Sequence, residues 1–184
     1  MLAYVFWHWK QRAIPASEYE SLQRAFHAAL AAAPSDGFSR SFTVALSGAP
    51  WLNAGGEGYE DWYLVRDSAA LDPLNEAAVT ASRQSAHAAA AAAVAGGAAG
   101  LYRLRLGDPL TPPRHAQWFA KPQGMSYPRL WEMLAPVLRE TGAALWMRQM
   151  VLGPTPEMCV HSATALKLPS EISAASYELR AVWG

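Results

Sequence analysis

The sequence predicts an α+β protein made of two β-α-β-β-α-β repeats whose sheets pack face to face. Apolar residues at helical spacing in the first half recur at a constant shift in the second, where Tyr19, Leu22, Phe26 and Leu30 become Tyr127, Leu130, Leu134 and Leu138. Just upstream, an aromatic segment also recurs, as Trp7-His8-Trp9-Lys10 and Trp118-Phe119-Ala120-Lys121. Segments typical of strands and helices follow the same order in both halves. Such a duplication constrains architecture strongly and chemistry weakly.

Composition excludes several classes of protein. The 184 residues carry no formal net charge and are 52% hydrophobic, which is typical of a globular chain that buries a substantial core. No run of Lys or Arg offers the positive surface that nucleic acid requires, so no nucleic-acid partner is expected. Eight Trp are present, so large rings must fill either the core or a pocket.

Neither a membrane nor an oxidising compartment is expected. The N-terminal run Leu2–Trp7 lacks the basic segment that precedes the apolar part of a signal peptide, and no stretch has the ~18 apolar residues of a membrane span. Cys159 is the only cysteine, so it cannot form a disulfide within the chain and is expected to be a small buried side chain. A cytoplasmic location is therefore predicted.

Alternation and turn residues define the elements of the first half. In order, these are a strand 2–9, a helix from Ser17 to the residues before Pro34, strands 38–47 and 59–66, helices 68–79 and 81–95, and a strand 101–106. Ser17 and Glu20 have the spacing of a capping box. The stretch 81–95 is Ala-rich, which gives high intrinsic helix propensity, and it is predicted either to extend the helix 68–79 or to form a second one; Gly96-Gly97 would stop it.

The second half follows the same order in fewer residues. Its predicted elements are a strand 115–120, a helix 126–140, strands 145–152 and 157–162, and a final strand 177–183. The counterpart of the second helix is shrunken or lost between Leu166 and Ser176. Each half therefore has the order of a ferredoxin-like (split βαβ) unit, with residues 1–107 as the first repeat and 108–184 as the second. Such a unit carries helices on one sheet face only, and the second copy would cover the other.

Because side chains alternate along a strand, the repeat can be used to assign its faces. Val5, Trp7 and Trp9, matched by Ala116, Trp118 and Ala120, form a wholly apolar face that should meet the helices. The opposite, mixed face should line the space between the sheets; it comprises Tyr4, Phe6, His8 and Lys10, matched by His115, Gln117, Phe119 and Lys121. In the third strands, Met158 and Val160 should face the helices, whereas the inward positions are Glu157, Cys159 and His161, matched to Glu60, Trp62 and Leu64. The matched pairs differ mainly on this inner face, so a single site would be asymmetric.

Three features of the sequence can be compared with known families. They are the order of the elements, the repeat, and motifs such as Tyr59-Glu60-Asp61-Trp62-Tyr63-Leu64-Val65. On these features the chain resembles the dimeric α/β-barrel superfamily, in a tandem form with both ferredoxin-like halves in one polypeptide. The resemblance covers nearly the whole chain. It implies a barrel-like unit, and members of the superfamily include cofactor-free monooxygenases, haem enzymes, lyases and proteins of unknown role. Membership alone does not choose among these activities.

The histidines have no metal-ligand spacing such as H-x-H or H-E-x-x-H, and no P-loop or G-x-S-x-G motif is present. No metal or cofactor is therefore expected, with haem bound through His161 or His115 as the alternative that the resemblance implies. His27 and His87 fall on predicted helices and are expected at the surface.

Three functions remain open. In the first, the inter-sheet space binds a small aromatic or apolar molecule, through contacts with Tyr4, Phe6, Trp62, Gln117, Phe119, Lys121 and Arg148. In the second, the same space holds a cofactor-independent oxygenase or isomerase. There His8 or His161 accepts a proton, Glu157 assists as an acid or base, and Arg148 or Lys121 holds an anionic oxygen. In the third, the unit is a structural or assembly module with a filled core. Whether the unit forms a homodimer is also left open.

Overall fold

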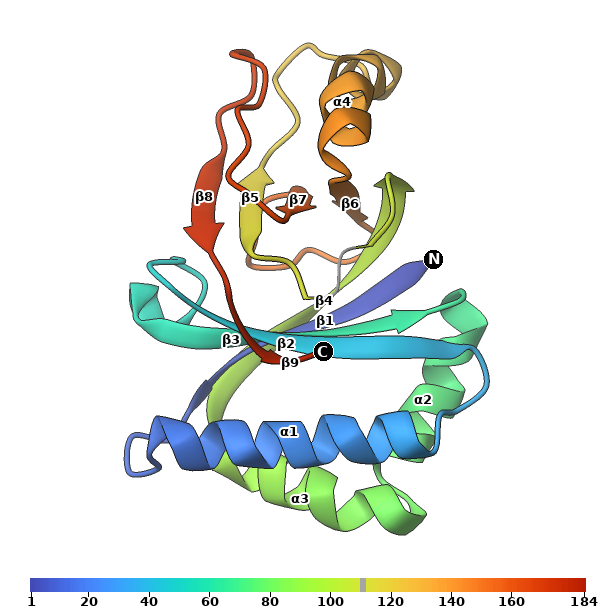
Figure 1. Cartoon of the computed structure of the whole chain (residues 1–184), viewed down its shortest axis with the longest axis vertical. Helices are drawn as coiled ribbons and strands as arrows, with labels where there is room; N and C mark the ends of the chain where they lie inside the picture. The colour runs from blue at the N-terminus through green and yellow to red at the C-terminus, as the bar shows by residue number, and fades with distance from the viewer. Residues whose placement is uncertain (110–111) are drawn as a thin grey trace.

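The computed structural model describes residues 1–109 and 112–184 and shows a mixed α+β fold around one antiparallel sheet (Figure 1). The first half comprises β1 (Leu2–Lys10), α1 (Ala16–Ala32), β2 (Phe38–Ser47), β3 (Glu57–Val65), α2 (Leu71–Ala78), α3 (Gln84–Ala93) and β4 (Val94–Leu106). The second half comprises β5 (His115–Phe119), α4 (Tyr127–Thr141), β6 (Ala144–Arg148), β7 (Met158–Ser162), β8 (Ala175–Glu178) and β9 (Arg180–Trp183). The predicted order of strands and helices is confirmed, except that the single final strand predicted at 177–183 is in fact two strands, β8 and β9, separated by Leu179. Within the described residues no helix forms between Leu166 and Ser176, as expected.

The nine strands lie in the order β8-β5-β7-β6-β4-β1-β3-β2-β9. The first four strands are therefore ordered β4-β1-β3-β2 and the next four β8-β5-β7-β6, so the same relative order occurs twice. The two groups join at two seams, where the end of β4 pairs with β6 and β9 pairs with β2. Since β9 follows β8 after a single residue, the sheet nearly closes on itself. Figure 1 shows α1, α2 and α3 outside the first group of strands and α4 outside the second.

Strand β4 begins at Val94, seven residues before the predicted strand, and takes up the Gly-rich end of the Ala-rich stretch. Its glycines explain why. A Cβ on Gly97 would lie 2.6 Å from the Trp7 carbonyl oxygen and 2.7 Å from the Phe6 ring. On Gly96 it would lie 2.5 Å from the Trp9 ring. The glycines let the aromatic residues of β1 lie directly against β4, so tertiary packing overrides the weak local preference.

The predicted capping box on α1 is wrong. The helix starts at Ala16 after Pro15, and no side chain caps it. Glu20 instead accepts hydrogen bonds from Arg180 of β9, at 2.5 and 3.2 Å, which tie α1 to the last strand of the second half. The second-half helix α4 does have a side-chain cap, because Ser126 accepts from the Arg129 N–H at 3.4 Å.

The space between the two groups of strands is filled by large rings. Four fully buried tryptophans meet there, two from each half: Trp7, Trp62, Trp118 and Trp146. Tyr102 packs edge-on against Trp118 and Trp7, with ring centroids 5.5 and 6.0 Å away. Because both groups of strands contribute rings to this cluster, they share one hydrophobic core and pack as a single unit.

The predicted faces of β1 are therefore inverted, whereas those of β7 are confirmed. Val5 and Trp7 point between the sheets, and Tyr4, Phe6 and His8 point to the helices. In β7, Cys159 belongs to the inter-sheet cluster and Met158 and Val160 pack in the cluster of α4. Alternation could not orient β1, because both of its faces are rich in aromatic residues. The largest rings occupy the wider space between two sheets.

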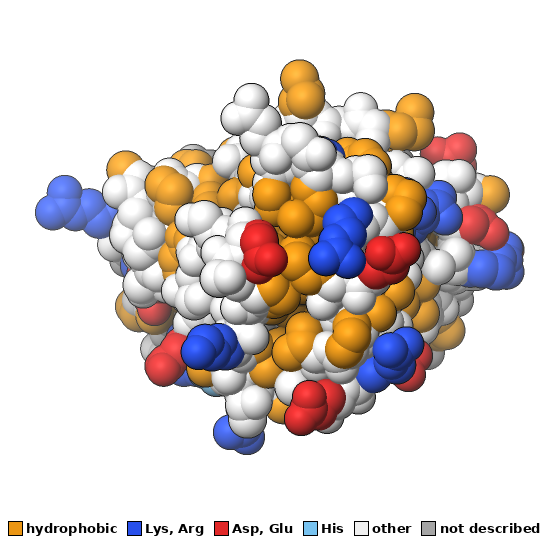
Figure 2. All heavy atoms as spheres, turned by 90° about the horizontal axis from the view of Figure 1, so that it is seen from above, with side chains coloured by type: hydrophobic (Ala, Val, Ile, Leu, Met, Phe, Trp, Pro, Cys, Tyr) orange, Lys and Arg blue, Asp and Glu red, His pale blue; other side chains and the backbone are white. Residues whose placement is uncertain are grey.

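None of the helices in the described residues is long and apolar enough to cross a membrane. Figure 2 views the molecule from its α4 end and shows acidic and basic side chains interspersed on that face, without a basic patch.

Candidate functional site

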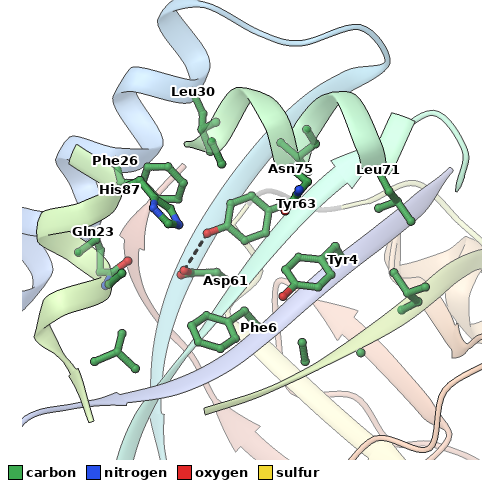
Figure 3. Close-up of a pocket in the computed structure, with 18 of the residues that line it drawn as sticks. Tyr4, Phe6, Gln23, Phe26, Leu30, Asp61, Tyr63, Leu71, Asn75 and His87 are labelled. Carbon is green, nitrogen blue, oxygen red and sulfur yellow. Dashed lines mark hydrogen bonds between the residues drawn. The ribbon is translucent and has the colours of Figure 1, made fainter. Parts of the chain in front are cut away.

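A cavity of about 720 Å³ lies between the outer face of the first group of strands and the helices α1, α2 and α3 (Figure 3). Its walls are mainly apolar and aromatic, including Tyr4, Phe6, Phe26, Leu30, Leu71, Leu74 and Leu101. Polar groups are few; they are Gln23, Asp61, Tyr63, Asp72, Asn75 and His87. Val151, from the loop after β6, also reaches the cavity, so the second half contributes to its wall. The prediction of a pocket between the sheets is thus wrong, since the cavity lies on the opposite face of β1 and β3.

Asp61 lies at the centre of a buried polar network in the wall of this cavity. Its Oδ1 accepts a hydrogen bond from the Thr43 hydroxyl at 2.7 Å, and its Oδ2 accepts one from the Tyr63 hydroxyl at 3.0 Å. Imidazole nitrogens lie on both sides of the carboxylate, with His8 Nε2 3.2 Å from Oδ2 and His27 Nε2 3.4 Å from Oδ1. We call these five residues the Asp61 network.

The histidines are held by further bonds. His8 Nδ1 is hydrogen-bonded to the Tyr19 hydroxyl, and its ring is stacked between Phe6 and Tyr59, at centroid distances of 4.9 and 5.6 Å. Because Thr43 gives its proton to Asp61, His27 Nε2 must donate to the Thr43 oxygen, at 2.8 Å. His27 Nδ1 pairs with the Ser41 hydroxyl at 2.7 Å. Both imidazoles are therefore fixed in position and orientation.

The sequence builds this network by simple alternation. In β3, Tyr59, Asp61 and Tyr63 point to the helices, whereas Glu60, Trp62 and Leu64 point between the sheets. His8 of β1 lies diagonally across from Asp61, since Phe6 pairs directly with it. α1 then brings Tyr19 and His27, two turns apart, onto the same layer.

Burial alone would raise the pKa of Asp61, but the charges and hydrogen bonds of His8 and His27 prevail and hold it well below its usual range. Asp61 is therefore ionised at neutral pH. Burial, reinforced by this carboxylate, raises the pKa of Tyr63 well above its ordinary value and also that of Tyr4. The wall of the cavity thus presents the neutral phenols of Tyr4 and Tyr63 beside the Asp61 carboxylate, whose charge is stabilised by the neighbouring imidazoles.

No such network is found among the described residues of the second half. If Trp7 and Trp118 are taken as matching positions, the strand registers place Phe119 at the position of His8 and Val160 at that of Asp61. Met158 then stands in the place of Tyr59, and the surrounding cluster is apolar throughout. The same registers match Glu60 with Cys159 and Trp62 with His161, which shifts the predicted matching of the third strands by two residues. Gln117, on the same face of β5 as Phe119, is a buried polar side chain there, and it donates to the Leu166 carbonyl and the Ser176 hydroxyl.

The structure distributes the predicted site residues over four places. Tyr4 and Phe6 line the cavity, and His8 lies directly behind them in the Asp61 network. Trp62 and His161 are buried between the two groups of strands, with their ring centroids 4.5 Å apart. The second-half residues lie elsewhere. Gln117 donates to the Leu166 carbonyl, Phe119 packs near α4, Lys121 donates to the Met125 carbonyl, Arg148 donates to the Thr155 carbonyl, and Glu157 accepts from the Tyr127 hydroxyl.

Sequence reasoning missed Asp61, Tyr63 and His27. His27 was expected at the surface, but it is fully buried in the network. An available signal was Asp61 itself, because aspartate is depleted in strand interiors and this one lies in the run 59–65, where every other residue except Glu60 is aromatic or aliphatic. His87 does line the cavity and is only half-buried.

Two titratable groups lie between the sheets, away from the cavity. Glu60 is fully buried and accepts hydrogen bonds from the indole N–H groups of Trp7 and Trp62, at 3.2 and 3.1 Å. Burial raises its pKa to about 7, against the lowering effect of these two bonds. His161 has no hydrogen-bond partner among the described residues, and burial lowers its pKa to about 3.

Within residues 1–109 and 112–184, no three His, Cys, Asp or Glu side chains are grouped as metal ligands. His115, the other histidine considered for haem, lies on a surface pocket with Arg114 and Glu178. The absence of a cofactor stays a prediction.

No protein-family model and no curated protein matches this chain. Solved structures do match it. A "putative monooxygenase" from Fusobacterium nucleatum has a TM-score of 0.66 and 8% identity, over 98% of this chain and 92% of that one. A second "putative monooxygenase", from Lactobacillus acidophilus, has a TM-score of 0.58 and 11% identity, over 98% of this chain and 94% of that one. At such identities the likeness concerns the fold alone.

Proposed function

We propose that this chain binds a small, largely apolar ring compound in the cavity between β1, β3 and the first-half helices. The observation that carries this proposal is the cavity itself, about 720 Å³ in volume, with aromatic walls and a few polar groups around Asp61. Its size falls within the range of roughly 300–1,000 Å³ that is typical of small-molecule sites. The inter-sheet space, which is filled by tryptophans, would then serve as the scaffold.

The proposal extends to the architecture. The repeated strand order, β4-β1-β3-β2 and β8-β5-β7-β6, supports two ferredoxin-like units in a tandem dimeric α/β barrel, residues 1–107 and 108–184. The two seams supply the contacts that two separate chains would otherwise make. In this arrangement, as far as the described residues go, the buried network around Asp61 belongs to the first unit, and the proposed site lies there.

Blocking the cavity should abolish binding. Ala90 is a buried residue of α3 that lines the cavity, and Ala90→Leu should weaken the binding of 1-naphthol at least tenfold, because the added side chain occupies ligand space. Isothermal titration of the wild type and the variant measures this. Ala88→Leu, an identical change on an exposed position of the same helix, is the control. Equal loss of affinity in both variants, or no binding by the wild type, would count against this cavity.

A second candidate is a cofactor-independent oxygenase, which the Asp61 network favours. Tyr63 donates to Asp61, and Asp61 contacts two imidazoles, so a proton taken from a bound substrate has a path away from the cavity. Since Asp61 stays ionised, the acceptor would be the neutral form of His8 or His27, and the carboxylate would stabilise the imidazolium that results. The two proteins of similar structure are each described as a "putative monooxygenase", which agrees with this chemistry.

The reaction balances without a cofactor when dioxygen is the oxidant. An activated aromatic CH₂ group loses a proton, and the carbanion passes one electron to O₂. The two radicals combine to a peroxide, which loses water to leave a ketone. One R₂CH₂ and one O₂ thus give one R₂C=O and one H₂O.

Oxygen uptake tests the second candidate. With a substrate of this class, one O₂ should be consumed per ketone formed, and Tyr63→Phe should lower the rate by about 10²-fold or more, since it breaks the path to Asp61. An oxygen electrode and product analysis measure both quantities. Binding without any oxygen uptake above the buffer rate would leave the protein as a binder, and an unchanged rate in Tyr63→Phe would exclude this path.

A further inference from the structure

The Tyr63 hydroxyl can only accept a hydrogen bond from a ligand. It has a single proton, and that proton is donated to Asp61 Oδ2 at 3.0 Å. Toward the cavity, which Tyr63 lines, the oxygen therefore presents lone pairs. The raised pKa of Tyr63 keeps the phenol neutral, so this arrangement persists across the physiological range.

The Asp61 carboxylate, in contrast, is already engaged on both oxygens. Oδ1 accepts from Thr43 at 2.7 Å and lies 3.4 Å from His27, and Oδ2 accepts from Tyr63 and lies 3.2 Å from His8. Two of its roughly four lone-pair positions accept the hydroxyl protons of Thr43 and Tyr63, and the two imidazole nitrogens lie against its other sides. The acceptor left for a ligand at this end of the cavity is thus the Tyr63 oxygen.

The charges around the cavity point the same way. Among the described residues that line it, the acidic ones are Asp61 and Asp72, and neither Lys nor Arg is present. An anionic ligand would lose its hydration without gaining a cationic partner. Tyr4 adds a second hydroxyl, which has no hydrogen-bond partner among the described residues, and its ring lies 5.9 Å from that of Tyr63.

We propose that the ligand is a ring compound with a neutral hydrogen-bond donor, a phenolic O–H or an aromatic N–H, directed at the Tyr63 oxygen, and that carboxylates are excluded. This inference rests on the binding function proposed above and specifies its ligand class. It also explains how the Asp61 network acts at a distance. Because Asp61 accepts the hydrogen bond from Tyr63, the Tyr63 oxygen must accept, and cannot donate, the hydrogen bond that it forms with the ligand.

Three probes of similar size separate donor, acceptor and anion: 1-naphthol, 1-methoxynaphthalene and 1-naphthoate. At pH 7 we expect 1-naphthol to bind about tenfold more tightly than its methyl ether, because only the naphthol can donate to Tyr63. Naphthoate should bind weakest of the three. In Tyr63→Phe the preference for the naphthol over the ether should fall below about threefold, with the affinity of the ether unchanged. Titration calorimetry gives all six affinities.

Tyr127→Phe is the matched control. Tyr127 also donates to a carboxylate, Glu157, at 2.6 Å, but it lies outside the cavity, so this variant should keep the naphthol preference. An ether that binds as well as the naphthol, a preference that survives in Tyr63→Phe, or tight binding of naphthoate would overturn the donor inference while the cavity function stands. If none of the probes binds to folded wild-type protein, both proposals fall.

Discussion

Asp61→Val should lower the free energy of unfolding by about 3–5 kcal/mol, the usual cost of removing one partner from a buried ionic cluster. The change leaves the Tyr63 and Thr43 hydroxyls and the neighbouring faces of His8 and His27 without their shared acceptor. Urea denaturation followed by Trp fluorescence measures the loss. The preference for 1-naphthol over its methyl ether should be lost as well, because Tyr63 would be free to turn its proton into the cavity.

The second half of the chain offers a control for this experiment. At positions that match His8 and Asp61 it carries Phe119 and Val160, and these pack in an apolar cluster. His8→Phe combined with Asp61→Val should therefore be more stable than the sum of the single changes predicts, by about 1–3 kcal/mol, as expected for residues in direct contact. Strict additivity, or an Asp61→Val change that costs less than about 1 kcal/mol, would show that the network is not a coupled unit.

The contribution of Glu60 to the free energy of unfolding should decrease as the pH rises from about 4.5 to about 7. Its pKa is raised by burial from 4.5 to about 7, so the folded state holds a proton that the unfolded chain releases in this window. The stabilisation is complete below pH 4.5 and is lost as the pH passes the folded value. The difference corresponds to about 3 kcal/mol. Glu60→Gln should remove this dependence, since the amide stays neutral at every pH.

His161 changes the stability with pH in the opposite direction, so its effect must be measured separately from that of Glu60. Burial lowers its pKa from 6.5 to about 3, so the stability that it contributes is lost as the pH falls below 6.5. Between pH 4.5 and 6.5 the two effects partly cancel in the wild type. His161→Phe should reveal the full Glu60 slope, and His161→Phe with Glu60→Gln should flatten it. If urea midpoints of His161→Phe do not change between pH 4.5 and 7, Glu60 does not hold its proton.

The sequence predicted the order of the elements well because local patterns determine it. Apolar spacing in α1 and α4 and alternation in β2 need no knowledge of the neighbouring elements. The start of β4 was missed for the converse reason. Helix propensity described the Ala-rich stretch, whereas the strand is set by Gly96 and Gly97, which admit the rings of β1. That contact joins residues about 90 positions apart.

The site was predicted in part. Tyr4, Phe6 and His8 were grouped correctly on one face of β1, but the face was assigned to the wrong layer. An alternating strand specifies which residues share a face and leaves open what covers it. The expected asymmetry agrees with the structure, although the polar network lies at the helix face and not between the sheets. Asp61 could not be assigned a role until α1 placed His27 beside it.

The two seams, where β4 meets β6 and β9 meets β2, determine how the molecule assembles. In a pair of separate chains, equivalent seams would form in a second-order reaction and would open on dilution. Here one polypeptide carries all four strands, so closure is intramolecular and independent of protein concentration. Because the two halves are different parts of one chain, neither half needs a surface that pairs with a copy of itself. That freedom allows one half to hold Asp61 and its histidines while the other holds Phe119 and Val160 at the positions that match His8 and Asp61.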